Sequence, residues 1–188
     1  MSLTKNDIIF ASLAGLLVSW LAIDFLGLYG LAFVVIFPIL SVIGLYITEY
    51  IGEKKPFVKQ IGKFFLIGSF ADVIDIKVFQ LLFWLAPFSL TFKTISFLTA
   101  TFVKYWVNKH WAFEKPEKDG IKKEAIQFFG VTLIGLTLNV SSFYYFTKIL
   151  GTQFGLSSII WTELSIIFAA LVAAVWNFLG YKFLVFKK

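Results

Sequence analysis

The sequence predicts an all-α transmembrane protein with six helices: a four-helix core of two parallel two-helix repeats, and an N-terminal helical hairpin. Of the 188 residues, 59% are apolar and only 15% are charged, and the mean hydropathy is +0.86. A soluble domain needs more polar cover than this. The apolar residues also gather into six runs, each near the roughly 20 residues that a helix needs to cross about 30 Å of hydrocarbon.

The first apolar run extends from Ile8 to Tyr50 and is interrupted only around Gly27 to Gly30. Its 43 residues are too many for one crossing, so we expect helices at about 8–27 and 31–50. They would form an N-terminal transmembrane hairpin domain over residues 1–55. The leading segment lacks the pattern of a cleaved signal peptide and is expected to be retained.

Four further apolar runs define the expected core domain, residues 60–188. They cover residues 64–84, 94–112, 126–149 and 157–181. The connections between them are short, and none has room for a soluble catalytic domain.

Lysines in the connections predict the orientation, because short cytoplasmic loops carry an excess of positive charge. One side holds Lys54, Lys55, Lys59, Lys63, Lys115, Lys118, Lys122, Lys123, Lys187 and Lys188. The other side holds only Lys93 and Lys148. We therefore expect a multi-pass protein of the cell membrane with cytoplasmic N- and C-termini.

Two segments of the core resemble one another. Lys63-Phe64-Phe65 matches Gln127-Phe128-Phe129 at the start of a helix, and residues 109–113 match residues 182–186 at the end of one. The repeats are residues 63–113 and 127–186. Each contains two spans, so both copies have the same orientation and are related by a pseudo-twofold axis along the membrane normal.

These motifs resemble the GtrA-like family of small four-helix membrane proteins over about residues 60–188. The residues that carry the resemblance are the opening Phe64, Phe65 and Gly68, and the closures Asn108, Lys109, Trp111, Phe113 and Asn177, Phe178, Lys182, Phe186. The second closure departs from the family pattern, because Leu184 stands in place of its Trp. The resemblance assigns no role to the N-terminal hairpin.

The resemblance implies a protein that works with a polyprenyl-phosphate glycosyltransferase on another chain. It would translocate (flip) a polyprenyl-phosphate-linked monosaccharide for the synthesis of cell-surface polysaccharide or glycoconjugate. Alternatively, it would be a membrane anchor or scaffold that recruits the transferase. A third reading, a small-solute exporter with a membrane carboxylate, is disfavoured by Lys104 beside that carboxylate.

Charged residues inside the spans are the most informative, because each costs about 2.5–3.5 kcal/mol near a helix centre. Counted from Phe64, Asp72 and Asp75 lie roughly 12 and 17 Å deep and share one helix face. Counted from Phe113, Lys104 lies about 14 Å deep, which predicts a buried Asp72–Lys104 pair.

Lys104 would neutralise a lipid phosphate, and Asp72 or Asp75 would hold its ammonium when the site is empty. An equally weighted alternative is a structural ion pair between two helices. The repeat register places Asp75 opposite Asn139 and Lys104 opposite Asn177. The full set of candidate substrate-binding residues is Asp72, Asp75, Lys104, Asn108, Lys109, Trp111, Asn139, Asn177 and Lys182.

Other classes of function are disfavoured by what the sequence lacks. It has no Cys, a single histidine, His110, and no arginine among its 17 basic residues. We therefore expect no metal site, no cofactor and no guanidinium contact to phosphate. No set of nucleophile, base and orienting residue can be assembled, which predicts that the chain is not an enzyme.

The expected partners follow from the same reading. They are membrane lipid, a polyprenyl-phosphate sugar and a separate glycosyltransferase, with no nucleic acid. A four-helix core too small to enclose a headgroup alone is compatible with a homodimer.

Overall fold

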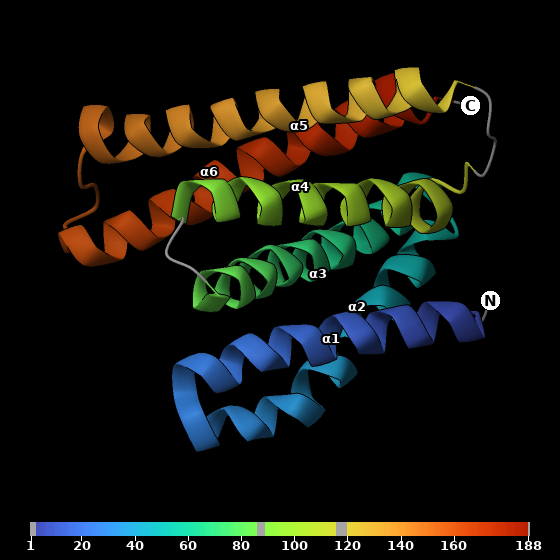
Figure 1. Cartoon of the computed structure of the whole chain (residues 1–188), viewed down its shortest axis with the longest axis horizontal. Coiled ribbons are helices and arrows are strands. Elements are labelled where there is room, and N and C mark those ends of the chain that lie inside the picture. The colour runs from blue at the N-terminus through green and yellow to red at the C-terminus, as the bar shows by residue number, and fades with distance from the viewer. Residues whose placement is uncertain (1–2, 86–88, 116–119, 188) are drawn as a thin grey trace. The chain divides into compact units, whose positions relative to one another are not determined.

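The computed structural model describes residues 3–85, 89–115 and 120–187, which form helices and no strand. The α-helices are α1 (Lys5–Leu26), α2 (Phe33–Gly52), α3 (Pro56–Leu85), α4 (Ser89–Val107), α5 (Ile121–Tyr144) and α6 (Ser158–Gly180) (Figure 1). A 3-10 turn, η1 (Gly27–Ala32), joins α1 to α2. Three π-helical segments follow α4, α5 and α6: η2 (Asn108–Ala112), η3 (Tyr145–Leu150) and η4 (Tyr181–Val185).

Within the described residues, three helical stretches are long and apolar enough to cross a membrane. They are Lys5–Gly52, Ile121–Leu150 and Ile160–Val185. The first has 48 residues and holds α1, η1 and α2. Helices α3 and α4 are not among these stretches. That all six helices cross the membrane therefore stays a prediction.

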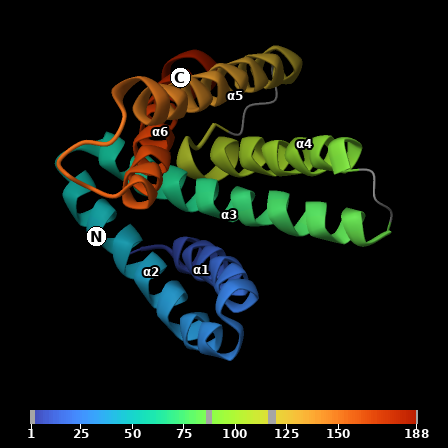
Figure 2. The ribbon, with the colours of Figure 1, turned by 90° about the vertical axis from the view of Figure 1, so that its left-hand side faces the viewer.

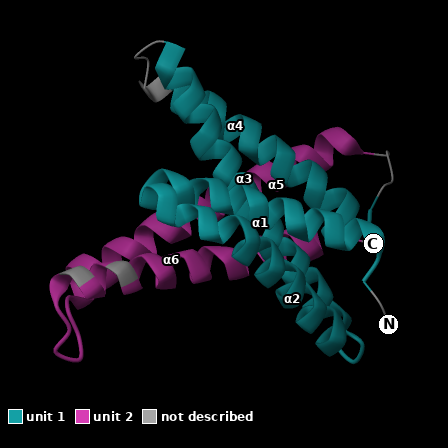
Figure 3. Ribbon diagram, turned by 90° about the horizontal axis from the view of Figure 1, so that it is seen from below, with its two compact units in different colours: residues 1–116 teal, residues 117–188 magenta. Residues whose placement is uncertain are grey.

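The chain forms two compact units, residues 1–116 and residues 117–188 (Figure 3). The predicted domain boundary between residues 55 and 60 does not coincide with this division. The reason is that α3 packs against α1 and α2 as well as against α4 (Figure 2).

Helices α1 and α2 form the hairpin of the first unit. Gly27, with φ of +57°, ends α1 in a conformation that favours glycine. The helices then approach so closely at Gly15 that an added Cβ would lie 2.5 Å from the Cα of Pro38. Beside this crossing, the Ser19 hydroxyl lies 2.8 Å from the carbonyl oxygen of Gly15 and 2.7 Å from that of Phe33, and it shares its one proton between them.

Helix α3 holds the first unit together through ion pairs with each of its three neighbours. Its pairs are Lys59 with Glu49 of α2 at 2.8 Å, Lys63 with Asp7 of α1 at 3.1 Å, Lys77 with Asp24 of α1, and Asp75 with Lys93 of α4 at 2.5 Å. Because Asp7 and Asp24 lie near opposite ends of α1, that helix runs along α3 in the same direction.

The second unit is the pair α5 and α6, which also cross closely. A Cβ on Gly180 would lie 2.5 Å from Cγ1 of Val131, and one on Gly135 would lie 2.3 Å from Oδ1 of Asn177. The indole of Trp176 donates to the carbonyl of Val131 at 3.0 Å. The small residues on both helices therefore allow the backbones to approach, as in other membrane helix pairs.

The hairpin crossing predicts different effects for two glycines of the same unit. Gly15→Ala should lower the unfolding temperature in detergent, at a cost of about 1–3 kcal/mol, because its Cβ meets backbone that cannot move aside easily. Gly44→Ala on α2 is the matched control, since its added Cβ would meet nothing within 4 Å. The control should keep or raise stability by up to about 1 kcal/mol. Equal effects of the two substitutions would contradict the close crossing.

Candidate functional site

A stripe of small and polar residues forms the buried face of α4. Ser96 is 0% exposed, Ala100 is 6% exposed and Asn108, just beyond the end of α4, is 0% exposed. Lys104 lies between Ala100 and Asn108 and is half-buried. Their spacing of four residues places them on one side of the helix. An ammonium therefore lies on a face that is otherwise closely packed.

Lys104 has no carboxylate within 4.0 Å among the described residues, so the expected close pair with Asp72 is not formed. Asp72 is exposed, although the opposite charges of the two side chains attract one another. The helix register explains the difference. Asp75 meets Ser96, so Asp72 is level with about Thr99, and Lys104 lies roughly 7 Å further toward the end of α4.

Asp75 is paired with α4 at another point. Its Oδ2 accepts from Nζ of Lys93 at 2.5 Å, and its Oδ1 accepts from Oγ of Ser96 at 2.6 Å. The carboxylate expected to hold Lys104 thus holds the lysine at the opposite end of α4.

Asn108 lies one turn beyond Lys104 and keeps one polar atom without a partner. Its Nδ2 donates to the carbonyl of Lys104 at 2.8 Å. Its Oδ1 is buried and has no hydrogen-bond partner among the described residues. Buried polar atoms of this kind are rare and need an explanation, and a bound ligand with a donor group is one.

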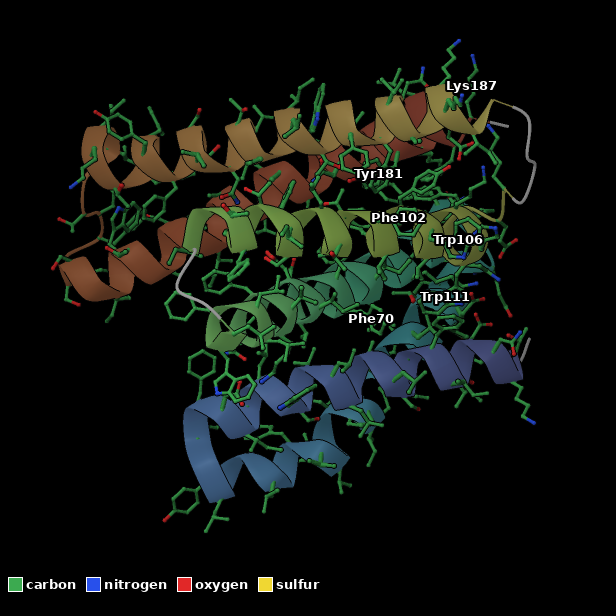
Figure 4. The ribbon with its side chains drawn as sticks, viewed as in Figure 1. Phe70, Phe102, Trp106, Trp111, Tyr181 and Lys187 are labelled. Carbon is green, nitrogen blue, oxygen red and sulfur yellow. The ribbon has the colours of Figure 1, made fainter. Side chains whose placement is uncertain are left out.

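The other two candidates of the first closure, Lys109 and Trp111, lie with Asn108 in η2. Lys109 is 2% exposed, with its Nζ 5.9 Å from the ring centre of Tyr105. Trp111 donates its indole N–H to Oδ1 of Asp7 at 2.7 Å and stacks on Phe10 with ring centres 5.0 Å apart (Figure 4). The N–H of Trp111 is therefore engaged by the N-terminal hairpin.

Sequence reasoning missed the role of Asp7. Asp7 is 6% exposed and forms a capping box with Thr4. Its carboxylate also accepts a hydrogen bond from the Trp111 indole and forms an ion pair with Lys63. The Thr4-x-x-Asp7 spacing is a signal for the helix start, but nothing in the sequence connects it to a residue 104 positions later. Lys63, which also lies 3.5 Å from Glu114, was assigned to a cytoplasmic connection.

The remaining candidates belong to the second unit. Asn139 is half-buried on α5. Asn177 of α6 lies against Gly135, and its Oδ1 is buried without a hydrogen-bond partner in the described chain. The ammonium of Lys182 lies 5.8 Å from the ring centre of Phe178 and 5.6 Å from that of Phe183.

The two closures share a local geometry. Both are π-helical, and each ends with a bond across five residues, from Phe113 N–H to Asn108 O at 2.9 Å and from Phe186 N–H to Tyr181 O at 2.7 Å. The two starts are also alike: the rings of Phe64 and Phe65 are T-shaped at 5.8 Å, and those of Phe128 and Phe129 at 6.4 Å.

Long apolar helices with ionisable groups among them define this chain as a helical membrane protein. Residues 63–186 match the family described as GtrA/DPMS, transmembrane domain. The match covers more than half of the chain, so the protein belongs to this GtrA-like family, as its opening and closing motifs predict. No curated protein and no solved structure matches the chain.

The buried Asp7 carboxylate predicts a stability effect. Asp7→Asn leaves the Lys63 ammonium with only the longer Glu114 contact, so unfolding in detergent should become easier by about 3 kcal/mol. An Asp7→Asn, Lys63→Met double variant should recover part of this loss, because it buries no unpaired charge.

The matched control is Glu49→Gln, which breaks the ion pair between Lys59 of α3 and Glu49 of α2. Both side chains of that pair are about a fifth exposed, at 23% and 20%, so the loss should stay below about 1 kcal/mol. The hydrogen bond with Glu49 raises the pKa of the Lys59 ammonium. The small contribution of this pair to the free energy of unfolding is therefore lost only as pH rises through the raised pKa. A larger loss for Glu49→Gln than for Asp7→Asn would contradict the assigned role of Asp7.

Proposed function

We propose that this protein translocates polyprenyl-phosphate-linked monosaccharides across the cell membrane, without itself being an enzyme. The observation that carries the proposal is that the Lys104 ammonium has no carboxylate close to it among the described residues. Every other lysine of α3 and α4 in the described chain has a carboxylate within 4.0 Å, whereas Lys104 has none. An unpaired ammonium inside a membrane is costly, and a lipid phosphate would remove that cost.

The neighbours of Lys104 suit a phosphate that carries a sugar. Asn108 Oδ1, one turn away, needs a donor such as a sugar hydroxyl. The negative charge of Asp72 is close enough to attract the ammonium but is not in contact with it. Asp72 thus balances the charge of Lys104 when the site is empty. A phosphate can then bind Lys104 without first breaking a close ion pair.

Membership in the GtrA-like family supports a place in polyprenyl-phosphate sugar metabolism. The proposed arrangement has six membrane crossings, both termini in the cytoplasm and two parallel repeats. The matching geometry of the two helix starts and the two closures supports the repeats. A separate glycosyltransferase would supply the lipid-linked sugar, and a homodimer would complete the enclosure of the headgroup.

Transport by reconstituted protein tests the proposal. Vesicles containing the wild-type chain should move a labelled polyprenyl-phosphate monosaccharide between leaflets faster than empty vesicles. Lys104→Gln should lower that rate about tenfold or more, because a charge-assisted contact worth about 1.5–3 kcal/mol is lost. Its unfolding temperature should stay the same or rise, since the substitution removes an unpaired buried charge.

Lys122→Gln is the matched control, because Lys122 is an exposed lysine near the start of α5. It should leave transport unchanged. No movement above that of empty vesicles would exclude translocation. Co-purification with a glycosyltransferase in that case would favour the scaffold function. A Lys104→Gln variant that is destabilised but still transports would assign Lys104 to folding.

A further inference from the structure

We propose that Lys93 forms a second binding site for the phosphate of the same lipid, at the outer end of the path that begins at Lys104. Asp75 holds the Lys93 ammonium when no phosphate is bound and releases it when one arrives. This inference rests on the proposed function and extends it, because it assigns the place where the lipid phosphate leaves.

The first argument is the alignment of the two lysines. They are 11 residues apart on α4, which at about 100° per residue is within roughly 20° of three full turns. Both therefore lie on the face that also carries Ser96 and Ala100, about 16 Å apart along the helix axis. Ala100 and the half-buried Phe97 lie between the two lysines on this face.

The second argument is the way in which Lys93 is held. Its ammonium binds Oδ2 of Asp75 at 2.5 Å, and the Lys93 side chain is 52% exposed. A phosphate can therefore reach the ammonium. Oδ1 of Asp75 accepts a separate hydrogen bond from buried Ser96 at 2.6 Å, so this carboxylate keeps a partner when Lys93 turns away.

Lys77, near the same end of α3 as Asp75, is an example of a lysine in a structural ion pair. Lys77 binds Asp24 and lies 4.3 Å from the ring centre of Trp20, with its side chain 13% exposed. Its ammonium is enclosed between α3 and α1. The Lys93 side chain is more exposed, at 52%, and its ammonium lies farther from a ring, 5.9 Å from the ring centre of Phe79, so a phosphate can compete for it more easily.

Two sites of moderate strength also suit transport better than one strong site. A ligand must bind well enough to enter the membrane path and weakly enough to leave it. Competition from Asp75 limits the affinity of Lys93 for phosphate, so the lipid is released at the outer end. Lys104 has no competing close pair and would bind phosphate more tightly.

Binding measurements on the full chain in detergent test this inference, with geranyl phosphate as the isoprenyl-phosphate probe and inorganic phosphate as the free anion. The wild type should bind geranyl phosphate at two sites of unequal affinity. Lys93→Gln should abolish the weaker site and keep the stronger. Asp75→Asn should strengthen the weaker site about five- to tenfold, because the competing carboxylate is gone while the ammonium remains.

Lys148→Gln, an exposed lysine outside α4, is the control and should leave both sites intact. An Asp75→Asn, Lys93→Gln variant buries no unpaired charge, so its loss of the weaker site with normal thermal stability would support a binding role rather than a folding role. If Asp75→Asn lowers stability and leaves affinity unchanged, Asp75–Lys93 is a structural pair and the inference is overturned.

Two further outcomes separate this inference from the proposed function. If Lys104→Gln leaves both sites unchanged while Lys93→Gln removes one, the outer site stands and the inner site of the proposed function fails. If Lys104→Gln removes the only site and Lys93→Gln has no effect, the outer site is excluded. Equal affinity for inorganic and geranyl phosphate at the weaker site would overturn the assignment of a lipid ligand.

Discussion

The need to neutralise charge within an apolar environment organises the first unit around α3. Lysines and an aspartate of this helix each find an opposite charge on α1, α2 or α4. The two pairs with α1, Lys63–Asp7 and Lys77–Asp24, are mostly buried, so they fix the position of α1 along α3. Hydrophobic packing alone could not do this, because lipid tails are as apolar as the side chains they would replace.

Asp7 connects this arrangement to the family motif. The first closure ends in Trp111, whose indole N–H donates to Asp7, and Phe10 of α1 stacks on the same ring. The N-terminal hairpin thereby supports the segment formed by the end of α4 and η2, in which Lys104 and Asn108 lie two turns and one turn before Trp111. A region to which the family resemblance gives no role thus becomes part of the frame around the candidate site.

The sequence predicts the helical class, the helix positions and the family, because apolar runs and short motifs are local signals. The sequence does not predict which side chains meet between two helices, because those contacts depend on the register of one helix against the other. Asp72 and Lys104 have similar depths when counted from helix ends, yet Asp75 meets Ser96 and leaves Lys104 without a close partner. The contact of Asp7 with Trp111 joins distant parts of the chain, and the π-helical closures follow no apolar period. The motifs locate the closures in the sequence but do not predict their π-helical geometry.

The ion pairs at both ends of α1 also constrain how the chain is assembled during synthesis. The N-terminal hairpin is made before α3, so Asp7 and Asp24 are at first without their partners Lys63 and Lys77. Both aspartates lie near helix ends, where water remains within reach and the cost of waiting is small. Once α3 is present, Lys63 pairs with Asp7 and Lys77 pairs with Asp24, and the two pairs hold α1 parallel to α3. The hairpin therefore reaches its final set of contacts only after α3 has been made.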